Sequence, residues 1–151
     1  MKTNSVAYQF VEFIPERIES GVLYISQRYG TAMHKCCCGC GEEVVTPLNP
    51  TDWSFQIEGG LVTLYPSIGN WSFACRSHYW IRKGEVIWAS QMSTQQVQHG
   101  RAIDHSVKQA YFEKLNSLKS HPAKPTPPTY GKMQHGFIQS MWANFKRWLN
   151  F

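Results

Sequence analysis

A cluster of cysteines constrains this chain more than any other feature. Four of its five cysteines lie within five positions, as Cys36, Cys37, Cys38 and Cys40. The odd total argues against a disulfide framework, and the amino terminus lacks the apolar stretch of a secretory signal. The chain contains no run of about 18 apolar residues, so we expect no membrane-spanning helix. We therefore expect a metal-binding protein in a reducing cytoplasm, where thiols stay available as ligands.

Two groups of candidate ligands can close one site. Cys37-x-x-Cys40-Gly41 has the spacing of a zinc knuckle, while Cys36, Cys38 and Cys40 alternate as residues on a strand do. His34 precedes them, and Cys75-x-x-His78 supplies a second pair further along the chain. Ligand pairs from two turns are typical of tetrahedral Cys/His sites. The spacing leaves open which thiols bind.

Zinc and an iron–sulfur cluster both suit these residue types. Zinc prefers closed tetrahedra of cysteine and histidine. A Rieske-type [2Fe–2S] centre takes two cysteines and two histidines from two loops, and Cys75-x-x-His78 resembles its second loop. The first loop differs, because the Rieske order is C-x-H and this chain has His34-x-Cys36. We favour zinc and keep [2Fe–2S] as the alternative.

The sequence predicts an α+β fold with four segments. Residues 1–92 form a small, metal-stabilised β-rich domain of zinc-ribbon-like or Rieske-like hairpins. Gly59-Gly60 and Arg82-Lys83-Gly84 mark two tight hairpin turns. The expected strands are Tyr8–Phe13, Val22–Ser26, Trp53–Ile57, Leu61–Tyr65, Trp71–Ala74, Tyr79–Ile81 and Glu85–Trp88.

Helical signals follow the β-rich domain. Ser93-x-x-Gln96 fits a capping box, so we expect a helix over residues 93–120 that packs on that domain. Residues 121–131 contain four prolines and predict an extended linker. Residues 132–151 predict an amphipathic helix with two tryptophans on its apolar face. That face can cover its own domain, a second copy, a partner protein or, less favoured, a membrane surface.

Charge is distributed unevenly along the chain. Residues 1–74 hold four basic and seven acidic side chains, a balance of −3, whereas residues 75–151 hold eleven and three, a balance of +8. The total of +5 is modest, and we expect no nucleic-acid partner. Asp104-His105-Ser106 contains the residue types of a hydrolase triad, but consecutive helical residues point in different directions. We assign no catalytic residue.

Joined motifs resemble those of a known family. They are His34-x-Cys36-x-Cys38-Gly-Cys40-Gly-Glu-Glu-Val-Val-Thr-Pro-Leu48, Pro50-Thr-Asp-Trp53, Pro66-Ser-Ile-Gly-Asn-Trp71 and Cys75-x-Ser-His78-Tyr-Trp-Ile81. They resemble small bacterial predicted metal-binding proteins of unknown function, and the resemblance covers about residues 8–105. Some members are encoded beside ubiquitin-like proteins, activating and conjugating enzymes, and JAB-type isopeptidases.

The resemblance implies a pathway and a ligand set. The implied role is an accessory in a bacterial ubiquitin-like modification pathway, within antiviral defence. The family usually has a non-cysteine at the position of Cys37. The implied ligands are therefore Cys36, Cys38, Cys40, Cys75 and His78, with His34 in reserve.

These observations predict a metal-stabilised binding module, either an adaptor or a ligase-like accessory rather than an established enzyme. Its partners would be proteins of that pathway, with a homodimer through residues 132–151 as a further expectation. The alternative function is Rieske-like electron transfer. Colour separates the two, because a zinc protein is colourless and an iron–sulfur protein is brown.

Overall fold

The computed structural model of the protein describes residues 1–120. The linker expected over 121–131 and the amphipathic helix expected over 132–151 lie outside the described residues. Contacts divide the chain into two units, Met1–Asn116 and Ser117–Phe151. The first unit contains all the strands described below and most of the helix, and it is the unit that positions the site.

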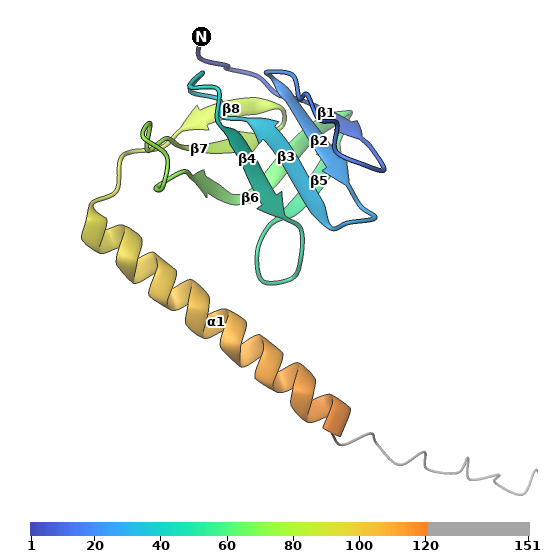
Figure 1. Ribbon diagram of the computed structural model, residues 1–151, viewed down its shortest axis with the longest axis vertical. Coiled ribbons are helices and arrows are strands. Elements are labelled where there is room, and N and C mark those ends of the chain that lie inside the picture. The colour runs from blue at the N-terminus through green and yellow to red at the C-terminus, as the bar shows by residue number, and fades with distance from the viewer. Residues whose placement is uncertain (121–151) are drawn as a thin grey trace, which may run out of the picture. The chain divides into compact units, whose positions relative to one another are not determined.

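Eight strands form two four-stranded sheets in this unit (Figure 1). The first sheet has the order β1-β2-β3-β4, with β1 parallel to β2 and the other pairs antiparallel. The second has the order β5-β6-β7-β8 and is antiparallel throughout. The strands of the first sheet are Ala7–Phe10, Val22–Ser26, Thr31–Lys35 and Glu43–Pro47. Those of the second are Ser54–Glu58, Leu61–Gly69, His78–Arg82 and Glu85–Trp88.

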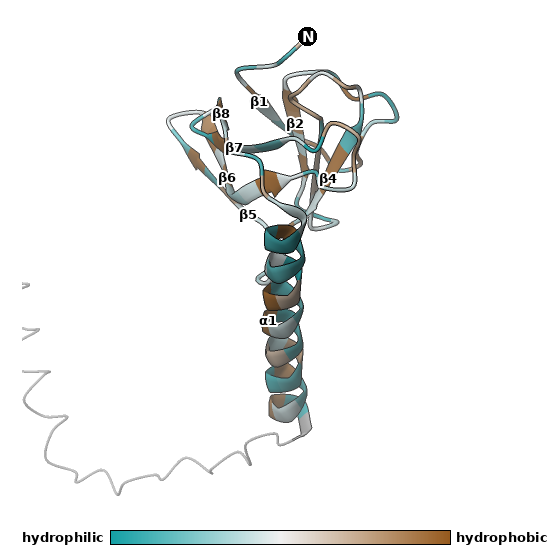
Figure 2. Cartoon of the chain, turned by 90° about the vertical axis from the view of Figure 1, so that its left-hand side faces the viewer, coloured by the Kyte–Doolittle hydropathy of each residue, from teal (hydrophilic) through white to brown (hydrophobic). Residues whose placement is uncertain are grey.

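One helix, α1, follows the sheets and spans Thr94–Ser120. Its first turn contains the predicted capping box: the Ser93 amide donates to Gln96 Oε1 at 2.8 Å, and the Gln96 amide donates to Ser93 Oγ at 3.2 Å. Hydrophilic residues cover much of the helix (Figure 2). No helix in the described part of the chain has the length and apolar character needed to cross a bilayer. Two sheets followed by a helix confirm the predicted α+β class.

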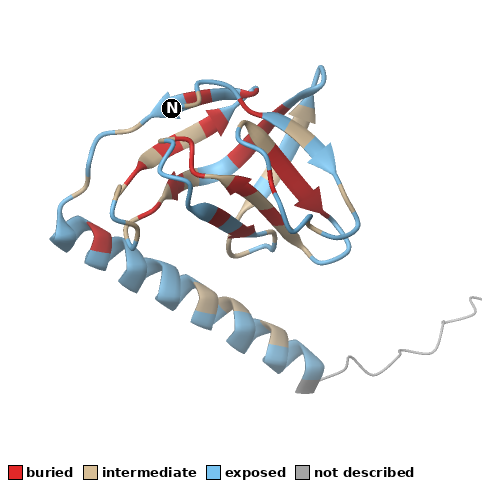
Figure 3. Cartoon of the chain, turned by 45° about the horizontal axis from the view of Figure 1, so that its top comes forward, coloured by how far each residue is buried: buried red, intermediate tan, exposed pale blue. Residues whose placement is uncertain are grey.

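The core lies between the two sheets (Figure 3). Strand β2 contributes Leu23 and Ile25, and strands β6 and β7 contribute Leu64 and Ile81, all fully buried. Strand β4 alternates between exposed and buried residues, the pattern of a strand with one face against a core. Both sheets thus pack their apolar faces together, and the turns at their ends are free to hold polar and sulfur side chains.

The structure corrects one expected strand and adds two that were not expected. Trp71–Ala74 was predicted to be a strand, but this segment is a turn in which the Phe73 amide donates to the Asn70 carbonyl. Strands β3 and β4 were not predicted. Each side of β3 mixes apolar and polar residues, because Ala32 and His34 are both buried on one face. That mixture hides the alternation of hydropathy on which strand prediction depends.

Candidate functional site

Four of the five cysteines converge beyond the end of β3. Cys36, Cys38 and Cys40 lie in the turn after that strand, and Cys75 lies in the turn between β6 and β7. Their four sulfur atoms lie within 4.8 Å of one another. Three of the sulfur–sulfur distances are 3.3 Å for Cys36–Cys38, 3.7 Å for Cys40–Cys75 and 3.9 Å for Cys36–Cys75. Gly39 adopts a φ of 84° between two of these ligands, a conformation that favours glycine.

These distances fit one tetrahedral metal ion. A tetrahedron with metal–sulfur bonds of about 2.3 Å places its sulfur atoms about 3.8 Å apart. The four cysteines can therefore bind a metal ion. A Rieske-type centre needs two histidine ligands, and the group that converges among the described residues contains cysteines alone.

Polar side chains from the β6–β7 connection support the sulfur atoms. Ser77 Oγ lies 3.1 Å from Cys36 Sγ and 3.5 Å from Cys75 Sγ. Asn70 Nδ2 donates to Ser77 Oγ at 2.9 Å and to Cys36 Sγ at 3.5 Å. Burial opposes ionisation of Cys75, but hydrogen bonds with the Ser77 side chain and backbone lower its pKa to about 7. This thiol is thus prepared to bind a metal as the thiolate.

His34 and Cys37 lie in the core around Tyr79 rather than in the cysteine group. His34 is 1% exposed, and its Nε2 is 2.9 Å from the Tyr79 hydroxyl. Burial lowers the pKa of His34 to about 4, so the imidazole is neutral at physiological pH. The Cys37 amide donates to the same hydroxyl, and burial raises the pKa of the Cys37 thiol to about 11.

His78 forms hydrogen bonds with two serines. Its Nδ1 lies 2.9 Å from the Ser90 carbonyl oxygen, and its Nε2 lies 3.1 Å from Ser67 Oγ. A carbonyl oxygen can only accept, so Nδ1 carries the proton. In the neutral ring, Nε2 then presents its lone pair and accepts the Ser67 hydroxyl proton. This is the geometry of a serine nucleophile and its general base.

The pairing of β6 with β7 brings Ser67 and His78 together. Ser67 belongs to β6, and His78 is the first residue of β7, opposite Gly69. Regular pairing of the two strands is interrupted between Leu64 and Ile68, which leaves Ser67 in the irregular part of β6. Both side chains are partly exposed and line a cavity of about 450 Å³.

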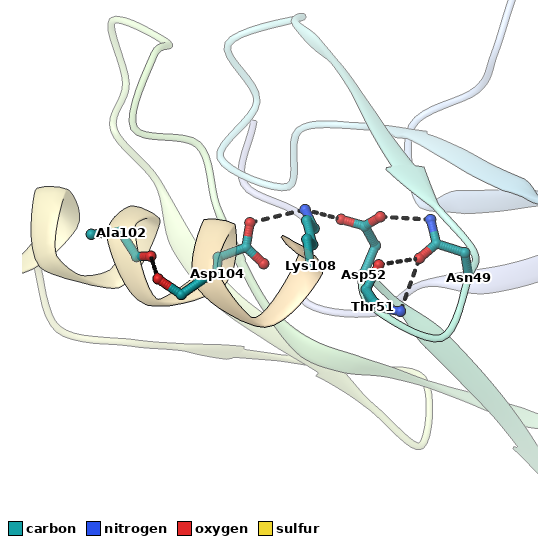
Figure 4. Close-up of polar contacts among 7 residues, drawn as sticks. Asn49, Thr51, Asp52, Ala102, Asp104 and Lys108 are labelled. Carbon is teal, nitrogen blue, oxygen red and sulfur yellow. Dashed lines mark hydrogen bonds and ion pairs between the residues drawn. The ribbon is translucent and has the colours of Figure 1, made fainter. Parts of the chain in front are cut away.

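The other wall of this cavity comes from α1. Lys108 Nζ lies 2.5 Å from the Asp52 carboxylate and 2.9 Å from the Asp104 carboxylate (Figure 4). Asn49 Nδ2 donates to Asp52 on its far side at 2.5 Å. The ion pairs thus connect the helix to the turn before β5. The resulting cavity holds a serine–histidine pair between a sheet and a helix.

The fold and the site together define a class: β-rich proteins with a four-cysteine group and a serine–histidine pair in a cleft. The chain belongs to the BubE family, whose model, described as the bacterial ubiquitination-like system serine protease, matches residues 10–89. This match confirms the resemblance to proteins of bacterial ubiquitin-like operons. Curated proteins and solved structures contain no match to the chain.

The matched residues include the cysteine group and both members of the serine–histidine pair, and they end before α1. The sequence predicted His78 as a site residue but not Ser67. A signal was present, because Pro66-Ser-Ile-Gly-Asn-Trp71 is one of the joined motifs. That motif contains Ser67, which precedes His78 by 11 residues, a separation that suits two adjacent strands.

Proposed function

We propose that this protein is a metal-stabilised serine hydrolase of a bacterial ubiquitination-like system, in which Ser67 is the nucleophile and His78 the general base. The observation that carries the proposal is the hydrogen-bond chain Ser90 carbonyl–His78–Ser67 inside a cleft. The description of the family as a serine protease supports a peptide or isopeptide bond as the substrate.

The chemistry follows from the ring's tautomer. Ser67 Oγ attacks the substrate carbonyl carbon while its proton moves to His78 Nε2. His78 then gives this proton to the departing amine, and an acyl ester remains on Ser67. A water molecule, deprotonated by the same Nε2, attacks the ester and releases the acid and the free Ser67 hydroxyl.

We propose zinc as the metal held by the four cysteines. A Cys₄ zinc site has no open coordination position, so the ion supplies structural support and no catalytic water. Cys75 belongs to the turn that joins the strand of Ser67 to the strand of His78. The ion would therefore hold together the two strands that carry the reacting groups.

The test is covalent labelling by a fluorophosphonate, which phosphonylates activated serines. We expect one label, mapped to Ser67, and its loss in Ser67→Ala and His78→Ala. Ser72→Ala, at an exposed serine in the following turn, is the matched control and should label like wild type. Failure of the wild-type protein to label at Ser67 would contradict the proposal.

The adaptor role expected from the sequence, with its setting in antiviral defence and in the cytoplasm, is the alternative proposal. A non-catalytic adaptor gives no reason for a serine hydroxyl to face an oriented imidazole. Pathway function that survives fully in Ser67→Ala would favour the adaptor over the hydrolase.

A further inference from the structure

Two tryptophan rings flank His78. The ring centroids of Trp71 and His78 lie 5.0 Å apart at an interplanar angle of 58°. Those of Trp80 and His78 lie 5.6 Å apart at 39°. Trp80 is two residues after His78 on β7 and therefore shares its face of the sheet. Trp71 reaches the imidazole from the turn after β6.

Each tryptophan is itself held in place. The Arg76 guanidinium carbon lies 5.9 Å from the Trp71 ring centroid, and that of Arg82 lies 5.2 Å from the Trp80 ring centroid. Gly69 provides space for Trp71, because a Cβ added there would lie 2.4 Å from Trp71 Nε1. The result is a continuous series of packed side chains with His78 at its centre.

We propose that Trp71 and Trp80 are positioning residues that hold the His78 ring with Nε2 toward Ser67. This inference rests on the proposed function. In serine proteases with a triad, a carboxylate on Nδ1 both orients the imidazole and stabilises the imidazolium. The Ser90 carbonyl can orient the ring, but it has no formal charge.

The two indoles add to what the carbonyl does. Rings packed at these distances limit rotation of the imidazole, and the π systems of the indoles attract the cation that forms when His78 takes the Ser67 proton. Other charges act at the same place. The guanidinium groups of Arg76 and Arg82 lie close to the same two indoles, and the cleft wall contains Asp52, Arg101, Asp104 and Lys108.

The experiment compares Trp71→Leu and Trp80→Leu in the full chain. Hydrolysis of a p-nitrophenyl ester gives kcat and KM separately. We expect kcat to fall roughly tenfold to a hundredfold, as misplacement of a catalytic group does, with KM unchanged. Trp71→Phe and Trp80→Phe keep an aromatic face and should recover most of the loss. Trp88→Leu, on the neighbouring strand, is the matched control.

A second measurement reports the tautomer of the His78 ring directly. Nitrogen-15 spectra of the imidazole show which ring nitrogen carries the proton. We expect Nδ1–H in the wild type and a mixture of tautomers in both leucine variants. Gly69→Ala displaces Trp71 without altering either tryptophan, so it should reproduce the kcat loss of Trp71→Leu. This variant keeps the test decisive if a leucine variant does not fold.

The outcomes separate the two proposals. Absence of fluorophosphonate labelling at Ser67 in the wild type overturns the hydrolase, and the tautomer comparison then still decides the positioning. Wild-type kcat and an unchanged Nδ1–H tautomer in both leucine variants overturn the positioning role and leave the hydrolase standing. A loss confined to KM likewise overturns the positioning role.

Discussion

At the scale of single residues, Asn70 connects the cysteine group to the segment that carries Ser67 and His78. It is buried, and its side-chain amide donates to both Ser77 Oγ and Cys36 Sγ. Asn70→Ala leaves both acceptors without this donor, and we expect it to lower the free energy of unfolding by about 1–3 kcal/mol. Loss of such a support for a metal ligand should also weaken metal binding roughly tenfold.

Denaturant unfolding and competition with a chromogenic chelator measure the two effects of Asn70→Ala. Asn4→Ala, at an exposed asparagine, is the matched control and should change neither. Wild-type metal affinity in Asn70→Ala would show that the amide does not support the ligand.

Residue chemistry also explains which site residues could be predicted from the sequence. Clustered thiols are unusual enough that the four cysteines of residues 36–40 indicate a site by their spacing. The family resemblance, and not the spacing, implied Cys36, Cys38, Cys40 and Cys75 among the ligands. Serine is common on protein surfaces, and Ser67 gains significance only through the imidazole that faces it. The C-x-x-H spacing predicted His78 as a ligand, whereas in the structure its two ring nitrogens contact Ser90 and Ser67.

At the scale of elements, the attachment of α1 depends on Lys108. Its ammonium group joins Asp104 on the helix to Asp52 on the turn before β5. We expect Lys108→Met to lower the free energy of unfolding by about 1 kcal/mol, the upper range for ion pairs near a surface. Lys119→Met, at an exposed lysine later on the helix, is the matched control and should have no effect.

The effect of Lys108→Met should depend on pH. The hydrogen bond from Lys108 holds the pKa of Asp52 below its usual 3.8, against the opposing effect of burial. Because the folded-state pKa is lowered, this stabilisation is fully present above the usual value and is lost as the pH falls through the lowered one. The stability difference between wild type and Lys108→Met should therefore shrink in strong acid, as followed by denaturant unfolding. A difference that is constant with pH would contradict this role of the pair.

The elements that could be predicted are those with local signals. The Gly59-Gly60 turn, the alternation of apolar and polar residues over Trp53–Ile57 and the capping box at Ser93 each specify structure within a few residues. Strands β3 and β4 have no such signal, because their inward faces include His34 and Thr46. His34 Nε2 contacts the Tyr79 hydroxyl, and the Thr46 hydroxyl donates to the Ala32 carbonyl. Tyr79 becomes a neighbour of His34 only after the two sheets pack, and Ala32 a neighbour of Thr46 only after β3 and β4 pair, so local sequence patterns do not contain that information.

At the scale of the whole molecule, the metal group and the cleft share one connection. The turn between β6 and β7 supplies Cys75 to the sulfur group and is bounded by the strands of Ser67 and His78. Folding and hydrolysis should therefore depend on metal binding, whereas metal binding should not depend on Ser67 or His78. Loss of the metal removes the support of the cleft, whereas loss of a reacting side chain leaves the cysteine group intact.

This asymmetry predicts different outcomes for Cys75→Ser and His78→Ala. Structural zinc contributes on the order of 10 kcal/mol to folding in small modules, comparable with the whole stability of a domain this size. We expect Cys75→Ser to lose the metal, most of its thermal stability and fluorophosphonate labelling together. His78→Ala should keep the wild-type metal content and a nearly unchanged melting temperature while labelling is lost, because its ring contacts Ser67 and Ser90 and not the sulfur atoms. Elemental analysis of both variants decides the matter: release of metal from His78→Ala would return this histidine to the ligand set that its spacing from Cys75 first indicated.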